Sequence, residues 1–211
     1  MADAKFLALD FGASSGRAIL ATVNDTITLQ ELHRFGNPQI RMLNHTYWDL
    51  AFLFNELKKG LAAAGRAGHH DLQAIGVDTW GVDFGLVARN HTLLGNPVTY
   101  RDSRTEGMME AAFNLLPQEE IYRRTGIQFM SFNTIYQLLS MVQERHPLLE
   151  AADRLLFMPD LFNYLMTGEM TCEYSIASTS QLLNARTRNW ESLLLKKLSI
   201  PEHLFLPIIE P

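Results

Sequence analysis

The sequence predicts an α/β fold built as a single domain. Three observations predict it. Strand-like runs rich in Leu, Ile, Val, Phe and Thr come first, an amphipathic helical pattern follows, and further strand and helix patterns succeed it. No repeat, low-complexity tract or Pro/Gly/Ser-rich linker interrupts the 211 residues. We therefore expect a mixed sheet flanked by helices, without an internal domain boundary.

Composition narrows the classes of partner. Hydrophobic residues make up 47% of the chain and charged residues 19%, which is enough apolar material for one sizeable core. The 23 acidic residues exceed the 18 basic ones, and no basic cluster is present, so nucleic acid is not expected as a partner. The first apolar run ends at Asp10, too short for a signal sequence or a membrane span. A lone cysteine, Cys172, fits a reducing compartment, so we expect a cytoplasmic protein.

The elements follow in order along the chain. Residues 6–11, 17–23 and 26–35 predict three antiparallel strands, separated by "GASSG" and "NDT". Asp49 is a candidate N-cap for a helix whose apolar residues recur at helical spacing. Two strands are predicted at 72–80 and 81–89, and a turn at 89–92 leads into a further extended run at 93–101. Helical patterns dominate after Ser103, in four segments: 104–115, 135–145, 160–166 and 190–198.

The stretch "LDFGASSGRAIL", residues 9–20, contains a Gly/Ser-rich turn between two apolar runs. It does not match the Walker loop, because only three residues separate Gly12 from Gly16 and Arg17 stands where Lys is required. The β-forming run after it also argues against a dinucleotide fingerprint. Backbone N–H groups and serine hydroxyls of such a hairpin can bind phosphate, with Asp10 facing a divalent cation. An ordinary hairpin turn is the alternative.

The stretch "GVDTWGVDFG", residues 76–85, brings Asp78, Trp80, Gly81 and Asp83 within six residues. Carboxylates accept hydrogen bonds from vicinal hydroxyls, an indole ring covers the apolar side of a sugar, and glycine lets a ligand approach the backbone. These residue types suit a sugar site. The alternative is that Trp80 belongs to the core and the aspartates end strands.

Two further stretches carry polar residues at places where ligands often bind. "TYRDSRTEG", residues 99–107, places Asp102 and its arginine neighbours after an extended run, although Asp102 also suits a helix N-cap. Asn133 is the polar side chain suited to a ligand in the apolar loop "GIQFMSFN".

The chain resembles the FGGY carbohydrate kinase family over nearly all of its length. The blocks that carry the resemblance are "ALDFGASSGRAIL", "GVDTWGVDFGL", "YRDSRT", "RTGIQFMSFNTIYQL", "MPDLFNYLMTGE" and "EYSIASTSQLLN". The resemblance implies an actin-like, ribonuclease-H-like ATPase fold and transfer of the ATP γ-phosphate to a sugar. L-Rhamnulose, accepting phosphate at its 1-hydroxyl, is the expected substrate, and L-fuculose or L-xylulose are the alternatives.

The resemblance also implies roles for individual residues. The phosphates of ATP would meet a loop that comprises Ala13, Ser14, Ser15, Gly16 and Arg17. Asp10 would face the Mg²⁺ that accompanies ATP, and Gly81 would lie against the ketose. The chemistry described above adds Trp80, Asp83, Asp102 and Asn133 to the sugar pocket.

The family's general base is an aspartate in a His-Asp-Thr block, and no such block occurs in these residues. We therefore expect residues 1–211 to form most of the N-terminal, sugar-binding domain, with the base and the ATP-binding domain encoded beyond Pro211. The chain alone is expected to be inactive. A sugar-binding fragment without catalytic activity is the remaining alternative.

Overall fold

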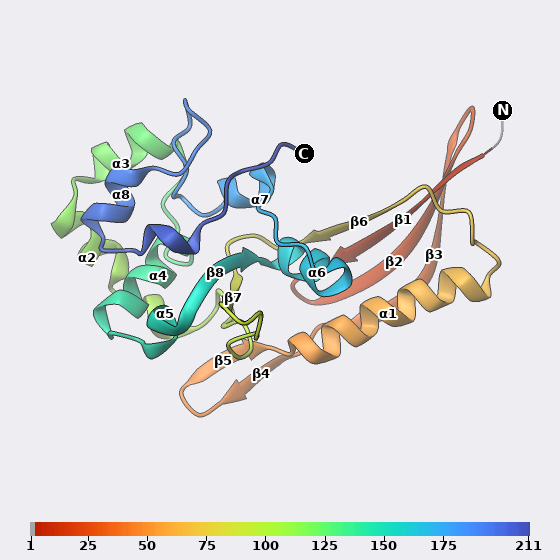
Figure 1. Ribbon diagram of the computed structural model, residues 1–211, viewed down its shortest axis with the longest axis horizontal. Coiled ribbons are helices and arrows are strands. Elements are labelled where there is room, and N and C mark those ends of the chain that lie inside the picture. Colours follow the sequence, from red (N-terminus) through yellow and green to blue (C-terminus); the bar gives the residue numbers. More distant parts are fainter. Residues whose placement is uncertain (1–2) are drawn as a thin grey trace. The chain divides into compact units, whose positions relative to one another are not determined.

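The computed structural model describes residues 3–211 (Figure 1). These residues form two compact units, each made of two stretches of chain. The N-terminal unit comprises the described residues up to Ile40 together with Asp49–Trp80, and the C-terminal unit comprises Arg41–Trp48 together with Gly81–Pro211. The sequence showed no linker at these divisions, because the chain passes between the units inside regular structure and tight turns.

A four-stranded mixed sheet organises the N-terminal unit. Strands β1 (Ala4–Phe11), β2 (Ser15–Val23) and β3 (Ile27–Gly36) pair antiparallel with their neighbours, which confirms the predicted meander. Strand β6 (Ala74–Thr79) pairs parallel with β1 and completes the order β3-β2-β1-β6. A parallel neighbour needs a crossover connection, and helix α1 (Leu50–Arg66) lies in that connection.

Helix α1 packs on one face of this sheet. Its predicted cap is confirmed, because the Asp49 carboxylate accepts a hydrogen bond from the Phe52 amide at 3.0 Å. The buried residues Leu53, Leu57 and Ala64 recur at helical spacing and form its packed face. The approach is closest at Gly60, where an added Cβ would lie 2.8 Å from the Cβ of Ala18 on β2.

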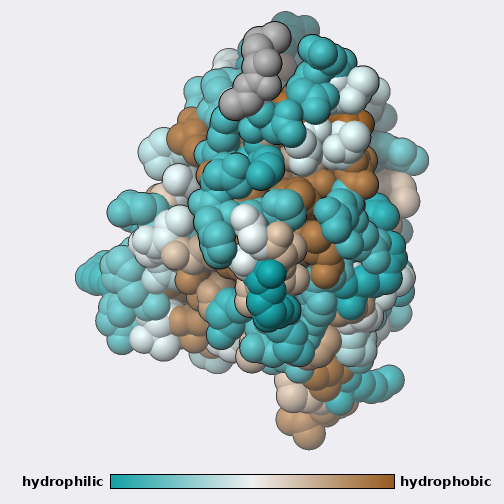
Figure 2. All heavy atoms as spheres, turned by 90° about the vertical axis from the view of Figure 1, so that its right-hand side faces the viewer, coloured by the Kyte–Doolittle hydropathy of each residue, from teal (hydrophilic) through white to brown (hydrophobic). Residues whose placement is uncertain are grey.

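The two faces of the sheet differ in burial. On β1, Leu7, Leu9 and Phe11 are buried, whereas the alternate residues are exposed or half-buried. On β3, Ile27 and Leu29 are 68% and 69% exposed. Figure 2 shows apolar side chains among hydrophilic ones over the end of the molecule where these strands lie.

The C-terminal unit is mainly helical around a two-stranded antiparallel pair. The strands of this pair are β7 (Phe84–Ala88) and β8 (Ala152–Phe157). The helices are α2 (Met108–Leu115), α3 (Gln118–Thr125), α4 (Thr134–Gln143), α5 (Pro147–Ala151), α6 (Met158–Thr167), α7 (Tyr174–Ser178) and α8 (Ser192–Lys197). Two short 3₁₀ helices, η1 (Ser103–Thr105) and η2 (Glu202–Leu204), join them.

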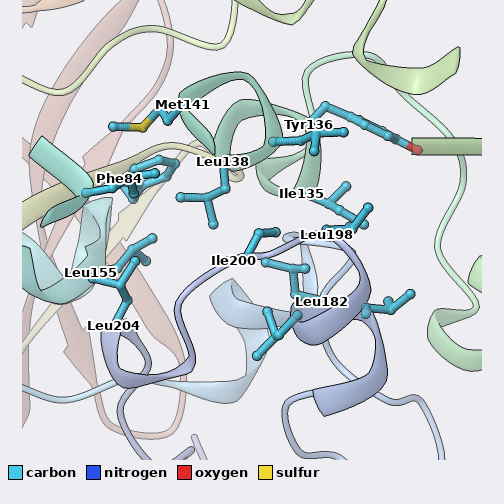
Figure 3. Packing of buried hydrophobic residues seen from close by; sticks show 14 of the residues in the cluster. Phe84, Ile135, Tyr136, Leu138, Met141, Leu155, Leu182, Leu198, Ile200 and Leu204 are labelled. Atoms are coloured by element: carbon cyan, nitrogen blue, oxygen red, sulfur yellow. The ribbon is translucent and has the colours of Figure 1, made fainter. Parts of the chain in front are cut away.

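The core of this unit is one continuous hydrophobic cluster. Figure 3 shows Ile135 and Leu138 of α4 close to Leu182, Leu198 and other residues far along the chain. Helix α4 is buried along almost its whole length, so it is the central helix of the unit. Cys172 is 2% exposed and is a free thiol within this cluster. Within residues 3–211, no helix combines the length and the apolar character that crossing a membrane requires.

Several elements differ from the sequence prediction. Strands β4 (Gln39–Met42) and β5 (His45–Trp48) form a hairpin that was not predicted, and β8, α3 and α5 were also missed. Most of these elements have six residues or fewer, too short for a clear period. The predicted extended run at 93–101 forms a loop with two isolated bridges, from Leu93 to Val87 and from Val98 to Tyr47.

We expect Gly60→Ala to destabilise the protein, although the same change in an exposed helix is stabilising. The new methyl group would meet the fixed Cβ of Ala18, so the expected cost is about 1–3 kcal/mol in the free energy of unfolding. Gly65→Ala in the same helix is the control, since its nearest neighbour is 3.9 Å away. Urea denaturation measures both variants. Equal stability of the two would contradict the close packing at Gly60.

Because Asp160, in the first turn of α6, is buried, we expect the stability of the protein to depend on pH. Asp160 is 2% exposed, and burial raises its pKa to about 7 despite a hydrogen bond from the Glu173 amide. Its Oδ2 has no hydrogen-bond partner within residues 3–211. Because the folded state binds this proton more tightly than the unfolded state, stability falls as the pH rises from about 4 to about 7.

We expect Asp160→Asn to remove this contribution. The stability of the variant relative to the wild type should increase by up to about 4 kcal/mol between pH 4 and pH 8, since each pKa unit corresponds to about 1.4 kcal/mol. Thermal or urea unfolding at both pH values measures the difference. A difference that stays constant with pH would show that Asp160 has an ordinary pKa.

Candidate active site

The predicted phosphate loop is the connection between β1 and β2 in the N-terminal unit. Asn37 supports it from two sides, because its amide N–H donates to the Ser14 carbonyl and its side chain donates to the Gly12 carbonyl, both at 3.0 Å. The Gly12 amide donates to the Ser15 carbonyl at 2.9 Å and closes the turn. The hairpin is therefore held in one shape without the use of the groups at its tip.

The groups at the tip are available to a ligand. Within residues 3–211, the amide N–H groups of Ala13 and Ser14 meet no acceptor, and neither do the hydroxyls of Ser14 and Ser15. Both serines are exposed, whereas Gly16 is buried at the start of β2. Neighbouring N–H and O–H donors without an internal acceptor suit a phosphate-binding turn.

Asp10, Arg17 and Asp78 lie together at one end of the sheet. The antiparallel register pairs Asp10 with Arg17, and the parallel register pairs Asp10 with Asp78. Paired residues share a face of a sheet, so the three side chains lie on the same side. The Arg17 Nε donates to the Asp10 carboxylate at 2.7 Å in a solvent-exposed ion pair.

The arrangement includes Asp78, which the sequence analysis placed among residue types suited to a sugar site. The strand register sets Asp78 beside Asp10. The signal that could have found this is that each aspartate lies next to the carboxyl end of its strand, since neighbouring parallel strands end at the same edge of a sheet.

The residues present fit a magnesium ion that arrives with its own ligands. Mg²⁺ prefers oxygen donors and is commonly bound by one or two carboxylates together with phosphate and water. Asp10 and Asp78 are adjacent carboxylates of this kind. In the part of the chain that the structure describes, no group of three or more His, Cys, Asp or Glu side chains is placed to hold a metal ion without further ligands.

Asp83, in the C-terminal unit, is a buried hydrogen-bond acceptor. Its Oδ2 accepts hydrogen bonds from Trp48 Nε1 at 2.6 Å and from the Tyr100 amide at 3.0 Å, and its Oδ1 accepts one from Gln137 Nε2 at 2.9 Å. The residue is 1% exposed, and burial raises its pKa to about 6 against the effect of these donors. At neutral pH the carboxylate is therefore ionised and occupied by protein donors.

Arg104 connects this group to Asp102. Its Nη2 donates to Gln137 Oε1 at 2.6 Å, and its backbone amide donates to the Asp102 carboxylate at 3.0 Å. The Asp102 carboxylate also accepts the Thr46 amide and is paired with His45. Burial opposes ionisation of Asp102, but these hydrogen bonds outweigh it and lower its pKa. The N-cap alternative for Asp102 is confirmed, because it caps η1.

Asn133 and Trp80 complete the set of sugar candidates. Asn133 is 3% exposed, and its side-chain amide donates to the Gln128 carbonyl and to Gln181 Oε1. Trp80 directly follows β6 and is half-buried. Contact of Trp80, Asp83, Asp102 and Asn133 with a sugar stays a prediction, and each of these residues has partners within the protein.

A cavity of about 170 Å³ lies elsewhere in the C-terminal unit. Its lining includes His45, Tyr47, Phe84, Arg104, Glu144 and His146. None of the residues predicted to bind the sugar lines it, so the structure does not identify this cavity with the predicted sugar pocket.

We expect Asp83→Asn to destabilise the protein by about 2–4 kcal/mol, because an amide nitrogen would face the N–H donors of this network. If Gln137 rotated its amide to compensate, its nitrogen would then face the Arg104 guanidinium. Asp153→Asn is the control, since its contacts to Arg89 and Arg154 are surface pairs of 3.7 and 3.5 Å. Urea denaturation measures both. If Asp83→Asn were as stable as the wild type, the Asp83 carboxylate would not be needed for folding and would be available to a ligand.

Comparison with known proteins agrees with this architecture. The chain is 42% identical over 207 residues to a rhamnulokinase of Bacteroides thetaiotaomicron. The aligned residues cover 98% of this chain and 42% of the relative. It is 43% identical to a rhamnulokinase of Mannheimia succiniciproducens, covering 97% of this chain and 43% of the relative. The chain thus spans less than half the length of these curated relatives.

Solved structures show the same fold at low sequence identity. A gluconate kinase from Lactobacillus acidophilus matches with a TM-score of 0.88 and 19% identity, covering 100% of this chain and 42% of that one. A xylulose kinase from the same organism matches with a TM-score of 0.87 and 20% identity, covering 98% and 42%. These neighbours and the mixed sheet flanked by helices agree with the actin-like, ribonuclease-H-like fold. Residues 5–211 match the N-terminal domain of the FGGY family of carbohydrate kinases, and the chain belongs to that family.

Proposed function

We propose that residues 1–211 form most of the N-terminal, sugar-binding domain of a cytoplasmic kinase that transfers the γ-phosphate of ATP to the 1-hydroxyl of L-rhamnulose. The observation that carries this proposal is the 42–43% identity to proteins named rhamnulokinase over 97–98% of the chain. The ATP-binding domain belongs to the proposed remainder of the protein, and the isolated chain is expected to be inactive.

The hairpin between β1 and β2 supplies phosphate contacts in this proposal. The Ala13 and Ser14 amides and the Ser14 and Ser15 hydroxyls donate to phosphate oxygens, and Asn37 holds the loop in place while they do so. Preorganised donors of this kind stabilise the charge that develops during phosphoryl transfer. Arg17 adds a positive charge beside them, from its pair with Asp10.

Asp10 and Asp78 are the residues that would hold Mg²⁺. When bound, the ion would neutralise charge on the phosphates of ATP. Binding of the ion at Asp10 requires the Arg17 side chain to turn away, which a surface ion pair permits at little cost. Both aspartates lie at the end of paired strands, so the sheet fixes the distance between their backbones.

The sugar side of the reaction depends on Gly81 and on a base outside this chain. Gly81 lies against the ketose in this proposal. The proton of the attacking hydroxyl needs an acceptor within hydrogen-bond reach, and we place that acceptor in an aspartate beyond Pro211. The residues of this chain therefore bind and orient the substrates.

We expect Asp10→Asn, in the complete kinase, to lower kcat by about 100-fold or more and to leave the KM for L-rhamnulose within about twofold of the wild type. The reason is that Asp10 is proposed to act on the phosphates. A coupled assay of ADP release measures both constants, with L-rhamnulose, L-fuculose and L-xylulose as substrates. Asp25→Asn is the control, because Asp25 is exposed in the β2–β3 turn.

Two outcomes of this assay would contradict the proposal. Full activity of Asp10→Asn would show that the carboxylate only ends a strand. A wild-type enzyme that prefers L-fuculose or L-xylulose would keep the kinase assignment and replace the substrate.

A further inference from the structure

The cavity of about 170 Å³ in the C-terminal unit has a wall with polar side chains whose outer groups meet no partner within residues 3–211. Residues of β5, β7, the segment 94–98 and the C-terminal end of α4 form this wall, and all of them belong to this unit. None of the residues proposed to bind the ketose, the phosphates or Mg²⁺ lines it. Because an enclosed space of about 150 Å³ can hold benzene, this cavity has room for a molecule with one six-membered ring.

Arg104 brings hydrogen-bond donors to the wall of the cavity. Its Nη2 donates to Gln137 Oε1 at 2.6 Å, which holds the guanidinium in place. Its Nη1 has no acceptor in the part of the chain that the structure describes, and its Nε is buried without one. A guanidinium that is fixed through one nitrogen and unpaired at the others is suited to recognition, because its five N–H donors form a rigid fork.

His146 adds a second donor to the cavity wall. Its Nδ1 accepts the Leu148 amide at 3.2 Å and thereby caps helix α5. Burial lowers the pKa of this imidazole, so the ring is neutral at pH 7 and carries its proton on Nε2. The Nε2–H group meets no acceptor among residues 3–211, so it is available to a molecule in the cavity.

Two further side chains of the cavity wall supply acceptors. His45 directs its Nδ1 at the Asp102 carboxylate, 3.0 Å away, so in the neutral form of His45 the Nε2 atom is left as an acceptor. Glu144 directly follows α4 and is exposed, and its carboxylate makes no hydrogen bond or ion pair with any residue that the structure describes. The cavity therefore presents acceptors as well as donors.

The charges around the cavity disfavour an anionic ligand. The guanidinium of Arg104 interacts with the carboxylates of Asp83 and Asp102, both of which are ionised at neutral pH, and Glu144 adds a third negative charge. A phosphate or a carboxylate would thus meet more negative than positive charge. A ligand with only a cationic group would leave the donors of Arg104 and His146 unpaired.

We propose that this cavity binds a neutral polyhydroxyl molecule, either a monosaccharide in its ring form or a polyol of similar size. A hydroxyl group donates and accepts hydrogen bonds, so it can pair with both kinds of group in the wall. The rings of Tyr47 and Phe84, which also line the cavity, offer apolar surface to the C–H groups of such a molecule. The inference does not depend on the function proposed above and adds a second binding site to the chain.

The test is isothermal titration calorimetry of the complete kinase in the absence of ATP. The neutral probes are L-rhamnose, D-glucose, D-galactose and xylitol, and we expect at least one to bind with a Kd of about 1 mM. Glucosamine and glucose 6-phosphate carry a positive and a negative charge on the same ring, and both should bind more weakly than the best neutral probe. L-Rhamnulose is titrated as well. A second, weaker site for it would identify the ketose itself as the occupant of the cavity.

Two variants of the cavity wall locate the binding. His146→Asn keeps an acceptor for the Leu148 amide and removes the Nε2–H donor. Glu144→Ala removes a carboxylate without an internal partner, so folding should not be disturbed. Each change should raise the Kd of the best neutral probe about fivefold, the effect of about one hydrogen bond. The KM for the ketose and the melting temperature of the unliganded enzyme should stay almost unchanged.

The matched controls are His70→Asn and Glu106→Ala, two exposed residues that do not line the cavity. Both should bind the probe like the wild type. If His146→Asn folds poorly, Glu144→Ala decides the question alone.

Three results would overturn the inference. If none of the neutral probes bound, the cavity would not be a site for polyhydroxyl molecules. If a charged derivative bound more tightly than every neutral probe, the assigned class of ligand would be wrong. A Kd that is unchanged in both cavity variants, or raised equally in the controls, would show that the sugar binds elsewhere on the enzyme.

Discussion

The C-terminal unit depends on one buried carboxylate. Asp83 joins the indole of Trp48, the backbone at Tyr100 and the side chain of Gln137, which come from three parts of the chain. A buried charge is tolerated only when its hydrogen bonds are made, so these donors must be in place for the unit to fold. The surrounding hydrophobic cluster supplies stability, whereas the carboxylate links the segments that meet next to β7.

The hydrogen bonding of Asp83 also involves the backbone turn at Gly81–Asp83, in which the Asp83 amide donates to the Gly81 carbonyl. Gln137 donates to Asp83 and to the carbonyl of Val82, which has a φ of +67°, so the amide that stabilises the buried carboxylate also holds this strained residue. Asp83 and the turn at Val82 therefore form one hydrogen-bonded system in which α4 is common to both. A side chain that the sequence offers as a sugar ligand is thus part of the hydrogen bonding that holds the backbone next to it.

In the N-terminal unit, strand pairing has the corresponding role. The parallel pairing of β1 with β6 places Asp78 on one side of Asp10, and the antiparallel hairpin places Arg17 on its other side. Asn37 holds the tip of the hairpin through its backbone and its side chain. A charged cluster and a set of donors are thereby positioned by strand pairing and by the hydrogen bonds of Asn37.

The sequence by itself determined the elements whose signals are local. The three-stranded meander, the Asp49 cap of α1 and the η1 cap at Asp102 follow from alternation, helical spacing and capping chemistry, and the family follows from blocks of residues that stand in order. Only the tertiary structure decided which polar residues meet. Asp78 and Asp83 are five positions apart in one motif, yet the first pairs with Asp10 in a sheet and the second is enclosed by Trp48 and Gln137. Spacing along a chain specifies to which side of a strand or helix a side chain points. The residues that this side chain contacts are specified by strand register and by the packing of segments that lie far apart in the sequence.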